Sequence, residues 1–384
     1  MNQLQPYQVM IRFTLPFMAL LIVACSARAP WVSRPTGRAY VEAEALFRHE
    51  PRWLGADAAL TIPLTDDRVL WLFDDTFVAV SDAYTRKVSK MVRNTVAIQI
   101  GVDPRTASMT FHWRQDANGS PASFFPERGS QWYWPRHGIL LDEGPLVIFL
   151  FLMGATPGQG LGFAHEGYAL ALIDNPHMSP EMWNLQIIDG KPNAYGIIPA
   201  TAVVQDGEYI VALAIHQEST RMGEHPGMLV RYPSKQLAQG NMDSAEWWAG
   251  ERRGWLPESE LSAGGPAYVL DDAGAECSLH WDERTESFIH VASYGFGDTT
   301  IGLRTAPAIT GPWSSPITVY DPPESDRPQP FVYAAKAHPK LAGPNAADLV
   351  VTYATNSFEF SDLFTMEGER SLYWPRLVLV PVGK

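Results

Sequence analysis

Short apolar runs separated by polar turns dominate the chain from Trp53 onward. Five of these runs predict buried strands, because each is brief and bounded by residues that favour turns. They are residues 69–73, 146–153, 209–215, 288–294 and 349–353. A turn with Asp, Glu or Gly precedes each run, and another apolar segment precedes each turn. The pattern therefore predicts a β-hairpin that is repeated five times.

The spacing of the hairpins indicates how the sheets are arranged. Successive central strands lie roughly 55 to 80 residues apart, which leaves room for four strands in each repeat. Repeats of this size are typical of propeller blades, since radial repetition protects the sheet edges. We therefore predict an all-β fold, a five-bladed β-propeller with a central funnel. Few segments indicate helices, and residues 180–183 and 234–238 could each form a short one. A β-sandwich is the alternative, although it does not require five copies of one hairpin.

The first residues resemble an export signal. Arg12 precedes an apolar run, residues 13–24, that is too short to cross a bilayer. The run ends in Ile22-Val-Ala-Cys25-Ser26, which resembles the lipobox of bacterial lipoproteins. We therefore predict that residues 1–24 are removed, that Cys25 carries a lipid and that the protein is exported to the cell envelope. An outer-membrane location is expected if the host has two membranes; an ordinary secretory signal cut near Ala27 or Ala29 is the alternative.

The remaining chain divides into a tether and one domain. Residues 25–50, which include prolines and a glycine, predict a tether, and residues 51–384 predict the propeller. Apolar side chains alternate through residues 39–47, so this segment could add the strand that closes the last blade. In that case the last blade would combine both ends of the domain.

Composition and charge restrict the partners. The chain has 29 Lys and Arg against 42 Asp and Glu, a formal charge of −13, and nucleic acid binding requires the opposite balance. Hydrophobic residues make up 46% of the chain, enough for a large core without disulfides, and Cys277 reads as a buried free thiol. We expect a monomer that contacts a membrane only through its lipid anchor. The sequence has no P-loop, HExxH or CxxC motif, so we expect neither a cofactor nor a metal ion.

Polar residues recur near the openings of the innermost strands. In a propeller these strands line the funnel, so residues near their starts converge. The set that the repeats place there is Asp57, His137, Thr201, Glu276, Lys336 and His338. For each of them alone, a structural role in a turn is an equal alternative. Together they predict a functional site in the funnel.

Two aspartates stand out within this set. Asp57 precedes the first strand of a hairpin, and Asp75 follows the second strand directly. A hairpin brings these two points together, so the carboxylates are predicted to be neighbours. Glycoside hydrolysis needs such a pair, since one group protonates the leaving oxygen and the other activates water or attacks the sugar.

Several motifs, taken in order, resemble one family. They are Leu54-Gly-Ala-Asp57, the run Leu-Trp-Leu-Phe-Asp-Asp-Thr-Phe at 70–77, Asn94-Thr-Val-Ala97, Tyr133-Trp-Pro135, Gly311-Pro-Trp313 and Tyr333-Ala-Ala-Lys-Ala-His338-Pro. The chain is thereby similar to exported five-bladed β-propellers, long catalogued as a domain of unknown function, that include endo-D-arabinanases. This family lies near the arabinanase and arabinofuranosidase propellers. The resemblance extends over residues 53–384.

The resemblance implies a catalytic pair, Asp57 and Asp75. The family's Phe-Gly-Asp-Thr becomes Phe-Asp-Asp-Thr here, so Asp74 replaces a glycine and adds a charge. We expect inversion, with Asp57 as general base, Asp75 as general acid and Glu276 assisting; the first two roles could be exchanged. The predicted substrate is an arabinan-like or other furanose or cell-wall glycan, as polysaccharide or oligosaccharide.

Further residues are candidates for contacts with the substrate. They suit hydrogen bonds to hydroxyls or stacking on sugar rings, and they are Asp74, Asn94, Trp134, Arg136, His137, Lys336, His338, Asn356 and Arg376. The alternative function is a non-catalytic glycan-binding lipoprotein on the same scaffold. Aromatic residues would suffice for that role, whereas the carboxylate pair favours an enzyme.

Overall fold

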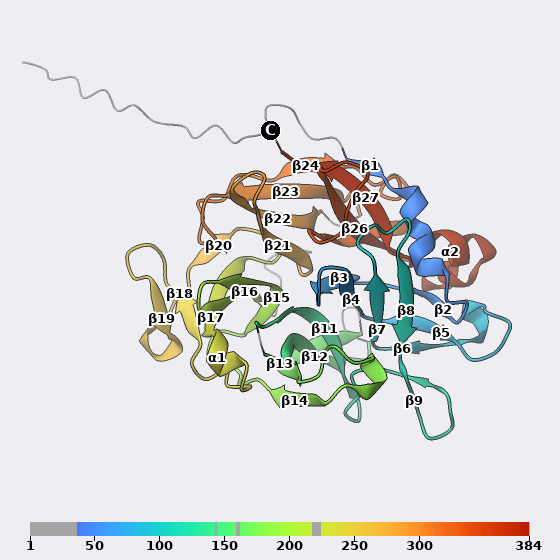
Figure 1. Cartoon of the computed structure of the whole chain (residues 1–384), viewed down its shortest axis with the longest axis horizontal. Coiled ribbons are helices and arrows are strands. Elements are labelled where there is room, and N and C mark those ends of the chain that lie inside the picture. Colours follow the sequence, from blue (N-terminus) through green and yellow to red (C-terminus); the bar gives the residue numbers. More distant parts are fainter. Residues whose placement is uncertain (1–36, 143, 159–161, 217–223, 296, 384) are drawn as a thin grey trace, which may run out of the picture.

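The computed structural model describes residues 37–142, 144–158, 162–216, 224–295 and 297–383. The predicted signal segment and Cys25 lie outside these residues. Five larger antiparallel sheets are arranged radially around a centre (Figure 1), so the chain is a β-propeller. We call these sheets blades 1 to 5 in chain order. Their number is consistent with the five blades that we expected.

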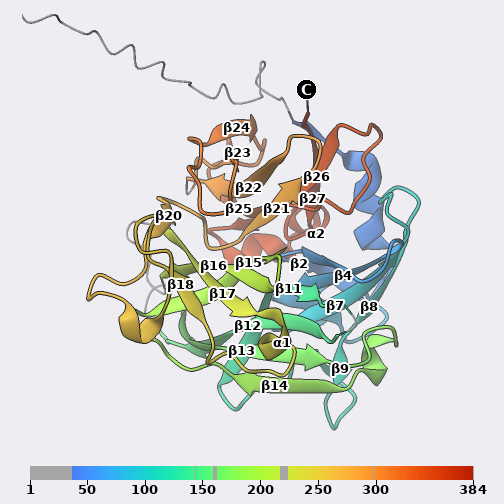
Figure 2. The same ribbon diagram turned by 60° about the vertical axis from the view of Figure 1, so that its left-hand side comes forward.

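In each blade the chain mostly runs outward, strand by strand. Blade 1 is β3 (Leu60–Pro63), β4 (Arg68–Phe73), β7 (Thr95–Ile100) and β8 (Ser108–His112); blade 2 is β11 (Gln131–Leu140), β12 (Leu146–Ala155), β13 (Phe163–Ile173) and β14 (Leu185–Asp189). Blade 3 is β15 (Ile197–Asp206), β16 (Tyr209–His216), β17 (Gly227–Pro233), β18 (Glu246–Trp248) and β19 (Trp255–Pro257), with β20 (Tyr268–Leu270) beside β17. Blade 4 is β21 (Cys277–Asp282), β22 (Ser287–Tyr294), β23 (Thr300–Ala306) and β24 (Ile317–Tyr320). The turned view in Figure 2 shows the strands of blade 2 side by side next to those of blade 3.

Both ends of the domain form blade 5. It is β25 (Pro330–Ala337), β26 (Asp348–Ser357), β27 (Arg376–Pro381) and β1 (Arg38–Ala39). Two small sheets lie outside the blades, one of β2 (Trp53–Ala56), β5 (Thr76–Ala79) and β6 (Ser89–Val92), the other of β9 (Arg114–Gln115) and β10 (Pro121–Ala122). The helices are short: η1 (Val41–Arg48), η2 (Arg86–Val88), η3 (Pro180–Met182), α1 (Ser234–Leu237), η4 (Glu258–Glu260), η5 (Phe360–Phe364) and α2 (Met366–Ser371). No helix in the described part of the chain is long and apolar enough to cross a membrane.

The five predicted apolar runs are the second strands of the five blades. They correspond to β4, β12, β16, β22 and β26, so this prediction is confirmed. Neighbouring strands cover their edges, and adjacent blades pack on their faces. This burial on all sides accounts for the nearly unbroken run of apolar residues in each of these strands. The two predicted short helices are also present, as η3 and α1.

Side-chain hydrogen bonds join the five inner strands around the axis. The ring of His137 bonds the Thr61 carbonyl in β3 at 3.2 Å and accepts from the Val203 amide in β15 at 2.9 Å. The His338 ring meets the Thr61 hydroxyl at 2.8 Å, which joins blade 5 to blade 1. Two further bonds complete the circle, Thr201 Oγ1 to the Ala275 carbonyl and the Ala337 amide to Ser278 Oγ. The circle fixes the width of the channel from which the site opens.

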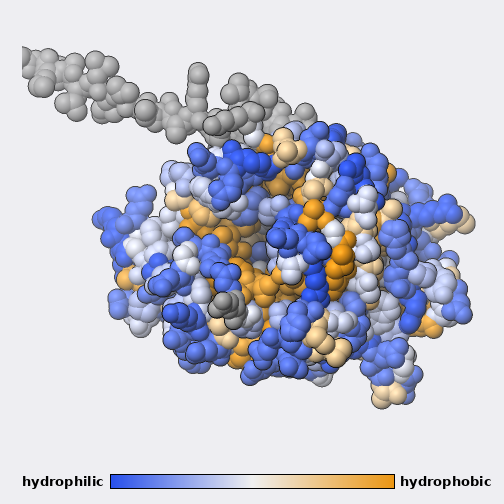
Figure 3. Space-filling view, in the orientation of Figure 1, coloured by the Kyte–Doolittle hydropathy of each residue, from blue (hydrophilic) through white to orange (hydrophobic). Residues whose placement is uncertain are grey.

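A cavity of about 290 Å³ occupies one end of this channel, lined by later residues of β3, β11, β15 and β21 and by the end of β25. Most of its lining is apolar. Figure 3 shows a hollow near the middle of one face of the molecule, with apolar side chains around it. His280 lines it with both ring nitrogens buried and without a partner among the described residues. Burial lowers the pKa of His280 to about 4, so the ring is neutral near pH 7.

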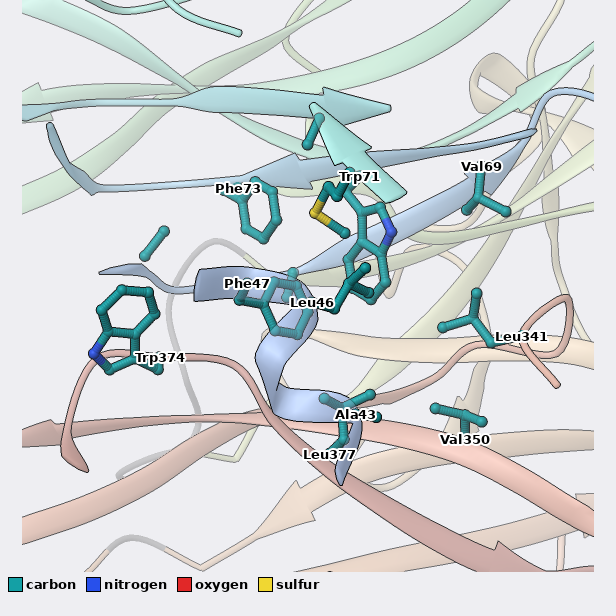
Figure 4. Close-up of a cluster of buried hydrophobic side chains, with 14 of the residues drawn as sticks. Ala43, Leu46, Phe47, Val69, Trp71, Phe73, Leu341, Val350, Trp374 and Leu377 are labelled. Atoms are coloured by element: carbon teal, nitrogen blue, oxygen red, sulfur yellow. The ribbon is translucent and has the colours of Figure 1, made fainter. Parts of the chain in front are cut away.

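The segment before the propeller differs from our expectation. A strand was predicted at 39–47, yet only Arg38–Ala39 pairs with β27, and Val41–Arg48 forms the 3-10 helix η1. Figure 4 shows why: η1 points Phe47 into the space between blades 5 and 1, where its ring meets Trp71 edge-on with centroids 5.2 Å apart. Phe47 is fully buried, so this part of the expected tether is packed into the domain core.

Candidate active site

Four carboxylic acids from two blades gather at the mouth opposite the cavity. Asp57 lies in the turn between β2 and β3, Asp74 and Asp75 follow β4, and Glu276 precedes β21. The amide of Asp74 lies 3.4 Å from the Asp57 carbonyl, so the β3–β4 hairpin does bring the two acidic segments together. The charges of Asp74, Asp75 and Glu276 all act on Asp57. The four acids therefore form one electrostatic unit, which we call the carboxylate cluster.

An unusual backbone places Asp57 in this cluster. Gly55 has φ +113°, and a Cβ there would lie 2.2 Å from the Tyr373 carbonyl. Ala58 and Ala59, directly after Asp57, both have left-handed φ angles near 60°. The glycine of the Leu-Gly-Ala-Asp motif is therefore required for close packing, and the chain turns sharply after the acid.

Similar irregularities occur at the other strand openings. Pairing shifts between Pro135 and Gly138 in β11, between Ile198 and Ala202 in β15, and between Tyr333 and Lys336 in β25. Such bulges bend a strand and redirect its side chains. They direct Arg136 and Lys336 toward the cluster.

Three of the four acids have their own cation. Arg136 Nη1 lies 2.6 Å from Asp74, Lys336 Nζ lies 3.2 Å from Glu276, and Arg93 Nη1 lies 3.3 Å from Asp75. The Arg136 and Lys336 pairs are buried, and Lys336 also donates to the carbonyls of Ala58 and Ala334. Buried charges persist when they are paired and hydrogen-bonded in this way.

Asp57 differs from the other three acids. Its Oδ2 accepts a hydrogen bond of 2.7 Å from the Tyr333 hydroxyl, and no Lys or Arg of the described chain pairs with it. Its Oδ1 is buried without a hydrogen-bond partner among the described residues. Burial, and then the charges of Asp74, Asp75 and Glu276, raise the pKa of Asp57 well above its ordinary value. Asp57 is therefore the acid that the cluster keeps protonated.

The other acids titrate differently. Burial raises the pKa of Asp74 to about 7 although Arg136 lowers it, and burial raises that of Asp75 although Arg93 lowers it. For Glu276, burial is outweighed by Lys336 and Arg136, so its pKa falls below the ordinary value. A carboxyl group with a raised pKa, Asp57, and one with a lowered pKa, Glu276, thus share one site, and such a separation of pKa values is the condition for acid–base catalysis.

Aromatic rings form the wall next to Asp75. Trp134 Nε1 donates to Asp75 Oδ1 at 3.3 Å, and Phe163 meets the Trp134 ring edge-on with centroids 4.7 Å apart. The Arg93 guanidinium, which pairs with Asp75, lies 4.2 Å from the ring centre of Trp132. The half-buried Trp134 was a predicted substrate contact, and the structure places it at the cluster.

Four predicted substrate contacts have structural roles instead. Asn94 is fully buried, and its amide bonds the backbone of Phe125 and Tyr133. His137 and His338 belong to the circle of hydrogen bonds between blades, and burial lowers the pKa of His137 to about 4. Arg376 pairs with Glu44 of η1 at 2.7 Å. Because hydrogen bonds hold Asn94, His137 and His338 and an ion pair holds Arg376, we assign these four residues to the scaffold rather than to substrate contact.

The remaining predicted residues lie at or near the cluster. Asp74, Arg136 and Lys336 are buried members of its ion pairs, beneath the surface that a substrate would touch. Asn356 is half-buried at the end of β26. Tyr333 and Arg93 were missed, although Tyr333 begins the Tyr-Ala-Ala-Lys motif. No group of three or more His, Cys, Asp or Glu side chains within the described ranges could hold a metal ion.

Comparisons with known proteins agree with this fold. A family model described as a domain of unknown function (DUF5005) matches residues 42–381. A solved structure from Bacteroides ovatus ATCC 8483, provisionally assigned as a hydrolase, is similar with a TM-score of 0.69 and 15% identity over 90% of each chain. An α-L-arabinofuranosidase from Lactobacillus brevis has a TM-score of 0.45 and 14% identity, over 87% of this chain and 92% of that chain. An exo-1,5-α-L-arabinanase from a bovine ruminal metagenomic library has a TM-score of 0.41 and 9% identity, over 86% and 94%. No curated protein matches.

Proposed function

The chain belongs to the DUF5005 family, and we propose that it is a glycoside hydrolase acting on a polysaccharide or oligosaccharide. One observation carries the proposal: among the described residues Asp57 has no cationic partner, whereas Asp74, Asp75 and Glu276 each have one. This arrangement favours a protonated Asp57 beside an ionised Asp75, the two states that hydrolysis of a glycosidic bond requires.

The charges favour roles opposite to those we first assigned. Asp57, as general acid, gives its proton to the leaving glycosidic oxygen as the bond to the anomeric carbon breaks. Asp75, as general base, takes a proton from the water whose oxygen attacks that carbon, which inverts the configuration. Arg93 favours the ionised form of Asp75, because a guanidinium at 3.3 Å lowers the pKa of a carboxyl group that burial raises. The pairs Asp74–Arg136 and Glu276–Lys336 hold the cluster in place.

The sequence supports our proposals for the sugar and for the cellular location. The motifs that resemble the arabinanase-containing propellers favour an arabinan-like or other furanose or cell-wall glycan. The lipobox-like segment favours attachment of the enzyme to the cell envelope through Cys25.

Product analysis on a panel of glycans tests the activity. Arabinan, arabinogalactan, xylan, galactan and levan are incubated with the purified domain, and reducing ends are counted. We expect one class to be cleaved, and Asp57→Asn and Asp75→Asn to lower kcat by at least about 100-fold while the thermal transition remains cooperative. Retention of a glycan without any product would instead assign the non-catalytic binding role. Near wild-type turnover in either variant would refute the assigned pair, and Glu276 would be tested next.

Fractionation of cells tests the location. Cys25→Ser removes the thiol that a lipid requires, so the protein should move from the membrane fraction to the soluble exported fraction. Cys277→Ser serves as the control, since that thiol is buried and should leave the distribution unchanged. Continued membrane association of Cys25→Ser would contradict the anchor.

A further inference from the structure

A series of aromatic rings leads away from Asp57 along blade 5. Tyr333, which holds Asp57, lies with its ring centre 5.5 Å from that of Phe331. Phe331 in turn lies 4.7 Å from Phe358, with the two planes inclined at 33°. Phe331 and Tyr333 are two residues apart in β25, so they share one face of the strand. The series therefore leads from the cluster to the adjoining ends of β25 and β26, the two inner strands of the blade.

The outermost ring is exposed but firmly placed. Phe358 is 51% exposed, although a large apolar ring would gain free energy by burial. Its amide donates to the Gln329 carbonyl at 3.0 Å, and the preceding Ser357 is anchored by a 2.7 Å bond to Asp362. An exposed ring on an ordered backbone, continuous with a polar site, indicates a surface for binding.

An amide group lies beside the rings. Asn356 is directly opposite Phe331 in the β25–β26 pairing, so both side chains occupy the same face of the sheet. Its Oδ1 accepts from the Ser357 amide, whereas its Nδ2 donates no hydrogen bond within the described ranges. Ala354 lies opposite Tyr333 in the same pairing, so Asn356 and the residue facing Tyr333 are two positions apart on one strand.

We propose that Phe331, Asn356 and Phe358 form a second sugar-binding platform, which holds a glycan unit distant from the bond that is cleaved. This inference rests on the proposed function and adds to it a preference for chains over small glycosides. Sugar rings present C–H faces that stack on aromatic side chains, while their hydroxyls accept from an amide. An apolar partner would leave the Asn356 amide unpaired, and an acidic one would be repelled by the cluster, so an uncharged glycan fits best.

Kinetics on a long and a short substrate test the platform. The substrates are the polysaccharide that the wild type cleaves fastest in the panel, and the shortest oligosaccharide that it still cleaves. Phe358→Ala should raise KM for the polysaccharide about fivefold to tenfold and leave kcat and the kinetics of the short substrate unchanged. Phe358→Tyr keeps a ring and should retain wild-type values. Asn356→Ala, which leaves the rings intact, should also raise KM for the polysaccharide alone.

Trp281→Ala is the matched control. Trp281 is 39% exposed and packs edge-on against Phe288 with centroids 5.1 Å apart, but it lies at the cavity end of the channel. If Phe358→Ala behaves like Trp281→Ala on a polysaccharide that the wild type cleaves, the platform is refuted while the enzyme stands. If the wild type cleaves nothing, the same variants are compared by retention in gels containing each polysaccharide. Weaker retention of Phe358→Ala then supports the platform without the enzyme, and unchanged retention or none overturns it.

Discussion

The Tyr333 hydroxyl donates a 2.7 Å hydrogen bond to Asp57, the one carboxyl group of the cluster that pairs with no cation among the described residues. The contact joins the last blade to the first across the closure of the propeller. A neutral donor can orient a carboxylic acid without forcing it to ionise, which an arginine at the same place would do. The pairing thus orients Asp57, while burial and the charges of the neighbouring carboxylates keep its pKa raised in spite of this hydrogen bond.

Removing this phenol should change the pH profile. In Tyr333→Phe the bond that lowers the pKa of Asp57 is lost, so its pKa rises further. If Asp57 is the general acid, the alkaline limb of kcat/KM moves to higher pH, and the maximum falls by about tenfold because the acid is less well oriented. The profile is measured on the glycan cleaved by the wild type. Tyr268→Phe, an exposed tyrosine of blade 3, is the control; an alkaline limb that stays in place would remove Asp57 as its origin.

Replacing Asp57 should stabilise the fold above acidic pH. The raised pKa means that the folded state binds more protons than the unfolded state, so wild-type stability falls as pH rises from about 4 to the folded pKa. Between these two pH values the wild type loses about 1.4 kcal/mol of unfolding free energy per pH unit, and Asp57→Asn, which cannot ionise, does not. Its Tm should therefore match the wild type near pH 4 and exceed it increasingly at higher pH.

An aspartate with the opposite shift provides the control for that experiment. Hydrogen bonds from the Asn118 and Ser120 amides lower the pKa of Asp116. Asp116→Asn should therefore lose stability above the usual aspartate range rather than gain it. A pH-independent Tm difference for Asp57→Asn would show that its carboxyl group has an ordinary pKa.

The pair of Lys336 and Glu276 should behave as a coupled unit. Both side chains are buried, with 2% and 12% of their area exposed, so Lys336→Met leaves Glu276 as an unpaired buried charge. We expect a loss of about 3–5 kcal/mol in unfolding free energy. The double variant Lys336→Met/Glu276→Gln should recover part of that loss, as measured by denaturant unfolding of the wild type, of both single variants, Lys336→Met and Glu276→Gln, and of the double variant. Additive effects of the two substitutions would show that the pair is not coupled.

The repeated strands could be predicted because strands that are buried between blades consist of apolar runs, which are visible in the sequence. The apolar run at 146–153 appears as β12, for example, and it is bounded by the turns that the sequence indicates. The segment at 41–48 misled us because two periods coexist there. Val41, Ala43, Ala45 and Phe47 alternate as in a strand, yet the buried side chains are Ala43, Leu46 and Phe47, which is the spacing of a helix.

The site was predictable only in part. Asp57 and Asp75 are linked by one hairpin, and local topology sufficed to bring them together. Arg93 and Tyr333 reach the same point from other elements, and no sequence pattern records that contact. Asn94 was predicted to contact the substrate, but its side-chain amide donates to the backbone carbonyls of Phe125 and Tyr133, more than thirty positions away. The sequence does not reveal these hydrogen bonds.

The close approach of Gly55 and Tyr373 gives the most specific stability prediction. A Cβ on Gly55 would lie 2.2 Å from the Tyr373 carbonyl and 2.9 Å from Nη2 of Arg86. Arg86 cannot yield easily, because it is buried and donates to the Leu54 and Leu372 carbonyls on either side of this contact. Gly55→Ala should therefore cost more than about 3 kcal/mol.

Gly119→Ala separates the steric contribution from the backbone contribution. Gly119 also has a left-handed angle, φ +77°, but nothing lies within 4 Å of a Cβ there. Its substitution should cost about 1 kcal/mol, the price of the backbone angle alone. Gly55 also fixes the turn that carries Asp57. Gly55→Ala protein that still folds should therefore have a lower kcat than the wild type, even when kcat is measured below the Tm of the variant. Equal stability losses in the two variants would mean that the β2 segment can move away from Tyr373, and the acid would then not be held by this contact.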